Sequence, residues 1–403
     1  MKCVHQNDRI IIKMSELNLT KKKLLIRVDL NVPLSEGKIL SDKRIRAILP
    51  TLKIGIENKC SIILISHMGR PKEGQFNKQY SLKPVAEYLT QLIQKEVRFI
   101  SEWEDGFDLI EGEIVLLENI RFSAGEKDNS DNLSKKLADL CDIFVMDAFG
   151  SAHRKHASTY GVIEFSETAC AGPLMRKELD SISQIYLDSK SPIIAIVGGS
   201  KISTKLEVIE SLSKFVDYLI LGGGIANTIL KAQGKEIGKS LYEESMLGTA
   251  KEMIEKNSKC QIMEISDVVV SKEINDSSKP EIKDINSVSN DDLILDIGPK
   301  TSDAYEEIIK KSSTLIWNGP VGVFEIDQFG IGTNRIAQAI SQSDGYSIAG
   351  GGDTVSAIEK FKVTDGISYI STGGGAFLEF ICDKTLPSIE ALKNHAKNRE
   401  KGP

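Results

Sequence analysis

The chain has 403 residues, of which 41% are hydrophobic and 27% are charged, and its formal net charge is −6. This length exceeds what one hydrophobic core usually serves, so we expect two globular domains. The acidic balance argues against a nucleic-acid-binding or membrane-binding protein, because neutralising many phosphates requires a basic excess.

Two further features of the composition concern the compartment. No apolar run approaches the roughly 18 residues that a membrane helix needs, and the start of the chain has no signal-peptide core. The six cysteines are widely scattered and form no C-x-x-C pair, which favours reduced thiols over disulfides. We therefore expect a cytoplasmic protein.

The first 13 residues are polar up to three isoleucines, and a second methionine follows at Met14. We expect residues 1–13 to be a disordered extension or to precede the true start. The fold should then begin near Met14.

Short β-branched runs alternate with amphipathic segments through the first part of the chain. One helix is predicted from Asp42 to Ile56 behind a Ser41 cap, and others after Ser81 and over 131–140. The predicted strands are 24–28, 62–65, 114–117 and 143–146. Such alternation is typical of a mostly parallel sheet with helices on both faces.

A long amphipathic segment then separates the two halves. It runs from Pro173 to about Lys190, reads as one helix and is a natural connector between domains. Beyond it, strands are predicted at 193–197, 218–221, 293–295, 314–317, 346–349 and 368–370, and a polar loop at 271–291. The sequence thus predicts an α/β protein with two doubly wound, Rossmann-like parallel-sheet domains joined by a hinge helix.

Three glycine triplets lie in the second half, at 222–224, 350–352 and 373–375, and most predicted strands there run into glycine. Glycine lets main-chain N–H groups approach a nucleotide phosphate closely. Neither a P-loop nor a G-x-G-x-x-G fingerprint is present. One such segment is equally well explained by close helix packing, but five in one domain, counting 198–199 and 318–322, favour a bound nucleotide.

Basic residues in the first half fall at equivalent points of the predicted sheet. They lie at or just after a strand end, or in the first turn of the first helix: Arg27, Arg44, His67, Arg70, Arg121 and Arg154. The carboxyl ends of parallel strands meet at one edge of a sheet. A lone arginine is usually a solvated surface charge, but this set predicts an anion-binding site.

Several motifs closely resemble those of phosphoglycerate kinases. In the first half they are RVDLNVP (27–33), SHMGRP (66–71), LENIRF (117–122) and DAFGSAHR (147–154). In the second half they are GGSKISTK (198–205), LGGG (221–224), WNGPVGVFE (317–325), GGGDT (350–354) and STGGGA (371–376). The resemblance covers nearly all of the chain from Met14, in order.

The resemblance implies a glycolytic kinase that reversibly moves a phosphoryl group between 1,3-bisphosphoglycerate and MgADP, giving 3-phosphoglycerate and ATP. It implies a monomer in which 1–172 bind phosphoglycerate, 173–190 form the hinge, 191–387 bind nucleotide and 388–403 pack back on the first domain. The acceptor of the reverse reaction is a carboxylate that is already ionised at neutral pH. Transfer therefore calls for hinge closure and electrostatic stabilisation and for no general base.

Residue roles follow from the resemblance, position by position. Phosphoglycerate ligands would be Asp29, Asn31, Arg44, His67, Arg70, Arg121 and Arg154. Catalytic groups would be Arg44, Lys201, Gly351 and Gly374. Nucleotide ligands would be Gly199, Lys201, Lys205, Gly223, Gly298, Asn318, Val323, Glu325, Gly351, Gly352, Asp353 and Thr354. Asp353 would hold Mg²⁺, and a helix beginning at Gly373 would face the transferring phosphoryl group.

These residues also have structural explanations. Asp353 before Thr354 is typical of a helix N-cap, and Asp29 and Asn31 are typical of a turn. Two other classes of protein remain as alternatives. A nicotinamide-dependent oxidoreductase would need a glycine fingerprint that the chain lacks, and an inactive nucleotide-binding scaffold would be expected to have lost Arg44, Lys201 or Asp353, which are present.

Overall fold

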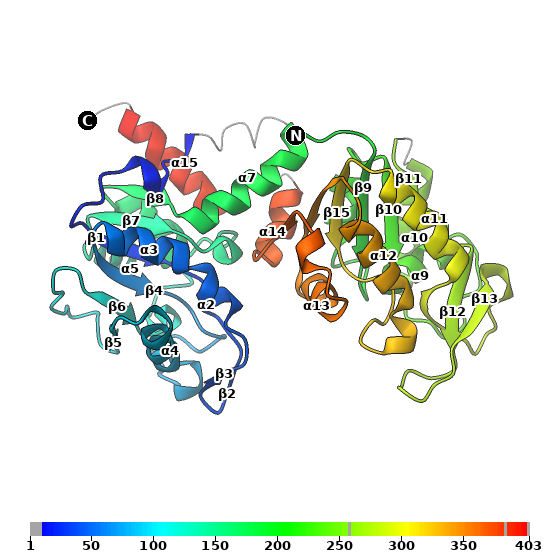
Figure 1. The fold of residues 1–403 in the computed structure, drawn as a ribbon, viewed down its shortest axis with the longest axis horizontal. Coiled ribbons are helices and arrows are strands. Elements are labelled where there is room, and N and C mark those ends of the chain that lie inside the picture. Colours follow the sequence, from blue (N-terminus) through cyan, green and yellow to red (C-terminus); the bar gives the residue numbers. More distant parts are fainter. Residues whose placement is uncertain (1–9, 257–258, 383–384, 401–403) are drawn as a thin grey trace. The chain divides into compact units, whose positions relative to one another are not determined.

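A computed structural model describes residues 10–256, 259–382 and 385–400. The chain divides into two compact units, with boundaries after Ser183 and before Thr385. The first boundary falls within helix α7 (Pro173–Leu187). Each unit contains its own six-stranded sheet with helices packed around it (Figure 1). Among the described residues, no helix is long and apolar enough to cross a membrane.

The sheet of the first unit is parallel throughout, in the order β5-β6-β4-β1-β7-β8. Its strands are β1 Lys23–Arg27, β4 Ser61–Ile65, β5 Val97–Ile100, β6 Ile114–Leu117, β7 Ile143–Met146 and β8 Ala169–Ala171. A short antiparallel hairpin, β2 Leu34–Ser35 and β3 Lys38–Ile39, lies outside it. Every residue of β4, β6 and β7 is buried, which explains their continuous apolar sequences.

The helices of the first unit are α2 Lys43–Ala47, α3 Leu49–Glu57, α4 Lys83–Ile93, α5 Asp131–Ala138, α6 Val162–Phe165 and α15 Pro387–Glu400. The prediction of one helix from Asp42 to Ile56 was wrong, because the segment divides at Ile48. Pro50 has no N–H to continue the hydrogen-bond ladder but fits the first turn of a new helix. The residue before α2 is Asp42, not Ser41, and its side chain makes no cap bond.

The second unit has a parallel sheet in the order β11-β10-β9-β15-β16-β17. Its strands are β9 Ile193–Gly198, β10 Tyr218–Gly222, β11 Gln261–Ile262, β15 Thr314–Asn318, β16 Tyr346–Ala349 and β17 Tyr369–Ile370. Its helices are α8 Leu206–Leu212, α9 Gly223–Ala232, α10 Leu247–Lys256, α11 Pro299–Lys310, α12 Ile331–Ser341, α13 Gly352–Lys360 and α14 Gly375–Ile381.

A second sheet in this unit was not predicted. It is antiparallel, with β12 Asp267–Ser271 between β13 Glu281–Asp284 and β14 Leu293–Ile297. The predicted strand at 293–295 therefore exists but lies outside the parallel sheet. The prediction of a polar loop over 271–291 was wrong for β13. This edge strand is mostly exposed, which explains its polar sequence.

The expectation that the fold begins near Met14 was wrong for the described part of the N-terminal segment. Ile11 is 1% exposed, and the Ile12 carbonyl accepts a hydrogen bond of 2.9 Å from Ala171 N. On the same strand, Ala169 N donates to His395 Nε2 of α15 at 3.0 Å. Edge strand β8 thus has partners from both ends of the described chain (Figure 1). Residues 1–9 lie outside the described part.

Candidate active site

The carboxyl ends of three neighbouring strands, β1, β4 and β7, lie together at one end of the first sheet. Arg27 at the end of β1 is in register with Ile65 of β4 and Met146 of β7. The segments that follow these strands therefore begin at the same edge. Asp29 and Asn31 follow β1, and His67 follows β4. We call Asp29, Asn31, Arg44, His67, Arg70, Arg121 and Arg154 the anion cluster.

Arg44 is held by the turn that follows β1. Its Nη1 donates to Asp29 Oδ1 at 3.2 Å and to the Asn31 carbonyl at 2.9 Å. Asn31 N also donates to Asp29 Oδ1, at 3.1 Å. The Arg44 side chain remains 40% exposed. A guanidinium has five N–H donors, so Arg44 is oriented by the turn and can still bind an anion.

The peptide of Gly69 joins two more members of the cluster. Gly69 N donates to Asn31 Oδ1 at 2.9 Å, and its carbonyl accepts a hydrogen bond from Arg121 Nη1. Gly69 has φ +59°, and a Cβ there would lie 2.3 Å from the Tyr80 ring. Only glycine fits this approach. Arg70 follows directly and is exposed.

His67 is buried beside a second arginine. Its Nδ1 lies 3.1 Å from Nη2 of buried Arg27. Burial, together with the charges of Arg27, Arg154 and Arg44, holds the pKa of His67 well below its usual range, so the imidazole is neutral at pH 7. The Arg154 side chain is half-buried and donates from Nε to His153 Nε2 at 3.2 Å.

The second unit contains a cavity of about 330 Å³ beyond the ends of its parallel strands. Of the predicted nucleotide ligands, those that line it are Gly199, Gly223, Val323, Glu325 and Asp353. The other lining residues were not among the predicted ligands, and they include Ser200, Leu241, Ile265, Val268, Ile274, Leu293, Leu295 and Asp296. Gly298 does not line it. It precedes α11 and packs against the Asp267 carboxylate.

Glycines in and beside this cavity allow main-chain segments to touch. A Cβ on Gly198 would lie 1.7 Å from the Pro320 carbonyl oxygen. Gly223 has φ +64°, and its Cβ would lie 2.8 Å from the Gly199 carbonyl oxygen. The turns after β9, β10 and β15 therefore pack without intervening side chains.

The two predicted lysines have different environments. Lys205 Nζ donates to the Gly198 carbonyl at 2.5 Å and to the Asn318 carbonyl at 3.0 Å, which ties the end of β9 to the end of β15. Burial lowers the pKa of Lys205 to about 8, against the opposing charge of Asp353. Lys201 is exposed and can reach a ligand.

The start of α13 carries the candidate metal ligand. Asn318 Nδ2 donates to the Gly350 carbonyl at 2.7 Å, and Thr354 Oγ1 accepts from Gly319 N at 2.7 Å. Gly351, with φ +100°, turns the chain into the helix, and exposed Asp353 lies in its first turn. Asn318 Oδ1 is buried without a partner in the described structure. Gly374, with φ +53°, precedes α14, which starts at Gly375 and not at the expected Gly373.

These residues fit one kind of metal site. No group of three or more His, Cys, Asp or Glu side chains occurs among residues 10–256, 259–382 and 385–400 that could hold an ion alone. Mg²⁺ commonly binds through one or two carboxylates together with substrate phosphates. Asp353, exposed at the rim of the cavity, suits that mode.

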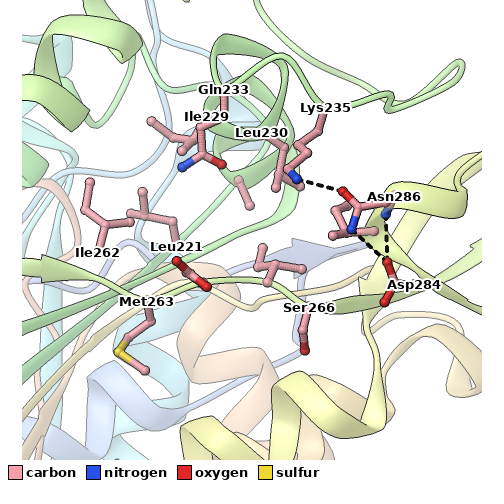
Figure 2. Close-up of a pocket in the computed structure, with 14 residues that line it drawn as sticks. Leu221, Ile229, Leu230, Gln233, Lys235, Ile262, Met263, Ser266, Asp284 and Asn286 are labelled. Carbon is pink, nitrogen blue, oxygen red and sulfur yellow. Dashed lines mark hydrogen bonds between the residues drawn. The ribbon is translucent and has the colours of Figure 1, made fainter.

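A second cavity of about 380 Å³ adjoins the first, and Ala226 and Ile265 line both. Figure 2 shows that three of its polar side chains bond to one another: Lys235 Nζ donates to Asn286 Oδ1 at 2.7 Å, and Asn286 Nδ2 donates to Asp284 Oδ1 at 3.0 Å. None of the predicted site residues lines it.

One unit thus presents arginine and histidine side chains at the carboxyl ends of its strands, and the other presents a glycine-lined cavity whose lining includes the exposed carboxylates of Glu325 and Asp353. This combination of a basic cluster and a glycine-lined cavity is compatible with phosphoryl transfer between a nucleotide and a small anionic substrate. Residues 14–384 match the family model described as phosphoglycerate kinase. The chain therefore belongs to the phosphoglycerate kinase family, which moves a phosphoryl group between 1,3-bisphosphoglycerate and ADP to give 3-phosphoglycerate and ATP.

Similar proteins agree with this assignment. A phosphoglycerate kinase of Legionella pneumophila (strain Paris) is 51% identical over 390 residues, which are 96% of this chain and 98% of that protein. The structure of phosphoglycerate kinase from Coxiella burnetii has a TM-score of 0.92 at 47% identity. That of Pyrococcus horikoshii OT3 has a TM-score of 0.82 at 32% identity. Each covers 96% of this chain and 100% of the solved chain. The predicted pair of parallel-sheet α/β domains is confirmed.

Proposed function

We propose that the anion cluster binds phosphoglycerate, that the glycine-lined cavity binds the nucleotide, and that Arg44 bridges the substrate carboxyl and the moving phosphoryl group. The proposal rests on the hydrogen bonds that orient the Arg44 guanidinium. Asp29 and the Asn31 carbonyl bind one terminal nitrogen, and the side chain remains partly exposed. Such a fork can make two directed bonds to an anion, and they strengthen as charge spreads in the transition state.

The nucleotide side would supply a cation and main-chain donors. Exposed Lys201 would contact the phosphates, and Gly351 and Gly374 would direct N–H groups toward the transferring group. Half-buried Lys205 would contribute positive charge while holding two strand ends together. Asn318, Gly352 and Thr354 would shape the phosphate-facing turn.

Mg²⁺ would be held by Asp353 together with nucleotide phosphates, and it would neutralise part of the phosphate charge. Val323 and Glu325 line the cavity and would contact the adenosine. No general base is required, because the acceptor of the reverse reaction is an ionised carboxylate. His67, which is buried and neutral, would bind the substrate as a hydrogen-bond donor.

The two ligands bind to separate units and must come within bonding distance. We therefore propose that α7, within which the unit boundary falls, acts as a hinge. Small-angle scattering should show a smaller radius of gyration with both ligands than with either alone. An unchanged radius at saturation would contradict hinge closure.

We also propose a cytoplasmic monomer. The five described cysteines are free thiols, as expected in a reducing compartment. Light scattering coupled to size-exclusion chromatography would measure the mass in solution, and a dimer mass would contradict the monomer.

A coupled assay with 3-phosphoglycerate and MgATP tests the residue assignment. Arg121→Ala should raise the KM for 3-phosphoglycerate and leave the nucleotide KM within about twofold, because Arg121 belongs to the anion cluster. Equal effects on both KM values would argue that Arg121 supports the fold and does not bind substrate.

A further inference from the structure

A buried carboxylate that no site assignment includes lies behind the anion cluster. Glu126 is 1% exposed, and both of its oxygens accept hydrogen bonds from one residue. Ser158 Oγ donates to Oε1 at 2.7 Å, and Ser158 N donates to Oε2 at 3.0 Å. Ser158 belongs to the π-helical turn η6 (Ala157–Gly161), a type of turn that often marks functional sites. Main-chain pairing of Ala157 N with the Glu126 carbonyl at 2.9 Å joins the same two segments.

The hydroxyl of Ser158 bonds to both Glu126 and Arg27 and so connects them. Its Oγ accepts a hydrogen bond of 3.1 Å from Arg27 Nε. A carboxylate only accepts and a guanidinium only donates, so the single hydroxyl proton must point to Glu126. Burial raises the pKa of Glu126, whereas the hydrogen bonds from Ser158 and the charge of Arg27 lower it. With Glu126 ionised, the direction of every bond from Glu126 to Arg27 is fixed.

Arg27 then determines which nitrogen of His67 carries the proton. Its Nη1 donates to the Val28 carbonyl, and its Nη2 lies 3.1 Å from His67 Nδ1. Since arginine has no acceptor, Nδ1 must accept, and the proton of the neutral imidazole resides on Nε2. We infer that Glu126 is a positioning residue which, through Ser158 and Arg27, fixes His67 as the Nε2–H tautomer.

The negative charge of Glu126 is needed because Arg27 is buried. Burial disfavours the charged guanidinium and lowers its pKa, whereas the charges of Glu126 and Asp29 oppose that shift. Arg154 adds an unfavourable like charge. His156 Nδ1 lies 3.8 Å from Glu126 Oε1, but burial and nearby arginines lower the pKa of His156 to about 4, so it is neutral at pH 7. Glu126 is thus the carboxylate that Arg27 contacts through a single intervening hydroxyl.

The fixed tautomer has a consequence for substrate binding. With Nδ1 occupied by Arg27, Nε2–H is the donor that His67 can offer to an anion. The other tautomer would present a lone pair to phosphate or carboxylate oxygen. This step rests on the proposed role of His67 as a phosphoglycerate ligand, whereas the tautomer itself rests only on the network.

Nitrogen-15 NMR of the full chain labelled at histidine reads the tautomer directly, with the His67 signals assigned by their loss in His67→Gln. Ser158→Ala breaks the link without removing a charge, and Glu126→Gln removes the charge. Ser166→Ala is the matched control, because Ser166 is a buried serine of the same unit that donates to the Val162 carbonyl.

We expect the Nε2–H signature at pH 7 in the unmodified protein and in Ser166→Ala. Ser158→Ala and Glu126→Gln should show a mixture of tautomers. They should raise the KM for 3-phosphoglycerate on the order of tenfold, with the nucleotide KM within about twofold, as for loss of a buried hydrogen bond to a charged group. Glu126→Asp, which keeps the charge, should recover part of the effect.

An Nδ1–H or imidazolium signal in the unmodified protein would overturn the inference. So would variants that keep both the Nε2–H signature and the 3-phosphoglycerate KM. If Glu126→Gln does not fold, Ser158→Ala carries the test alone. If His67→Gln leaves the KM for 3-phosphoglycerate unchanged while the ring signals behave as expected, the network is supported and the proposed substrate role of His67 fails.

Discussion

The two units hold their ligand sites in different ways. In the first unit, charged and polar side chains make up the site, and they are oriented by bonds to one another: Arg44 to Asp29, and Arg27 to His67. In the second unit, main-chain segments and apolar side chains form the cavity, and glycines such as Gly223 allow them to meet. We therefore expect a charge-preserving substitution to harm the first site, because it removes directed hydrogen bonds. A change which adds one methyl group should harm the second.

The largest expected effect concerns Asp353, the proposed Mg²⁺ ligand. Asp353→Ala, or excess chelator, should reduce turnover by on the order of 10³-fold, because the phosphate charge would no longer be neutralised. Steady-state assays at several Mg²⁺ concentrations would measure this. Asp365→Ala is the control, since Asp365 is another exposed carboxylate of the second unit. Full activity in chelator would remove the metal from the proposal.

A charge-preserving change should break the first site next most strongly. Arg44→Lys should lower kcat by on the order of 10²-fold, about 3 kcal/mol, with little change in nucleotide KM, because lysine keeps the charge but loses the fork. Arg46→Lys on the same helix is the control, since Arg46 pairs with Asp42 at 2.6 Å. Kinetics at fixed ionic strength would separate the two variants. A near-normal kcat in Arg44→Lys would leave Arg44 as a binding residue only.

A single methyl group should break the second site. Gly223→Ala places a Cβ 2.8 Å from the Gly199 carbonyl oxygen and should raise the nucleotide KM by on the order of tenfold. Gly234→Ala is the matched control, because Gly234 also has positive φ, +80°, but its Cβ would meet nothing within 4 Å. Both variants carry similar backbone strain. Equal nucleotide KM values in the two would show that strain, and not the close approach, matters.

The last expected effect is on stability and not on turnover, and it concerns Asp296, a buried carboxyl group that lines the cavity of the second unit. Asp296 accepts from Gly332 N at 2.6 Å and from Ile297 N at 2.9 Å, and burial raises its pKa to about 8. An unfolded aspartate titrates near pH 4, so between about pH 4 and pH 8 the folded chain holds a proton that the unfolded chain has lost. The free energy of unfolding should therefore fall with rising pH across this window, by at most about 1.4 kcal/mol per pH unit.

Calorimetric melting from pH 5 to pH 9 would measure this contribution as a difference between two proteins. Asp296→Asn should have the flatter profile, because its amide does not titrate. Parallel profiles would show that Asp296 stays ionised in the folded protein.

The residues that could be predicted from the sequence are those whose position depends on local pattern. Continuous apolar runs such as Ile62–Ile65 predict buried parallel strands, and His67 then follows a strand end by necessity. Pro50 indicates the division of the first predicted helix, but the prediction followed the apolar spacing and not the proline.

Other features depend on partners that sequence spacing does not reveal. Ile11 is buried because its segment pairs with β8, some 160 positions later in the chain. The apolar wall of the nucleotide cavity combines residues from several elements, such as Leu241 and Val268, that look like ordinary core residues. Glu126 and Ser158 are common polar residues, and their role becomes visible only from their burial and hydrogen bonds beside Arg27.

The pairing of β8 with segments from both ends of the described chain has a consequence for biosynthesis. Helix α15 leaves the ribosome after the whole second unit, yet it supplies His395 to β8 at the edge of the first sheet. The second unit is one continuous stretch, Gln184–Lys384, and can fold as soon as it emerges. At about 5–20 residues per second, its synthesis takes roughly 10–40 s. The first unit is thus completed only after the second has been translated, and the Ala169 N–H of β8 lacks its His395 partner for that interval.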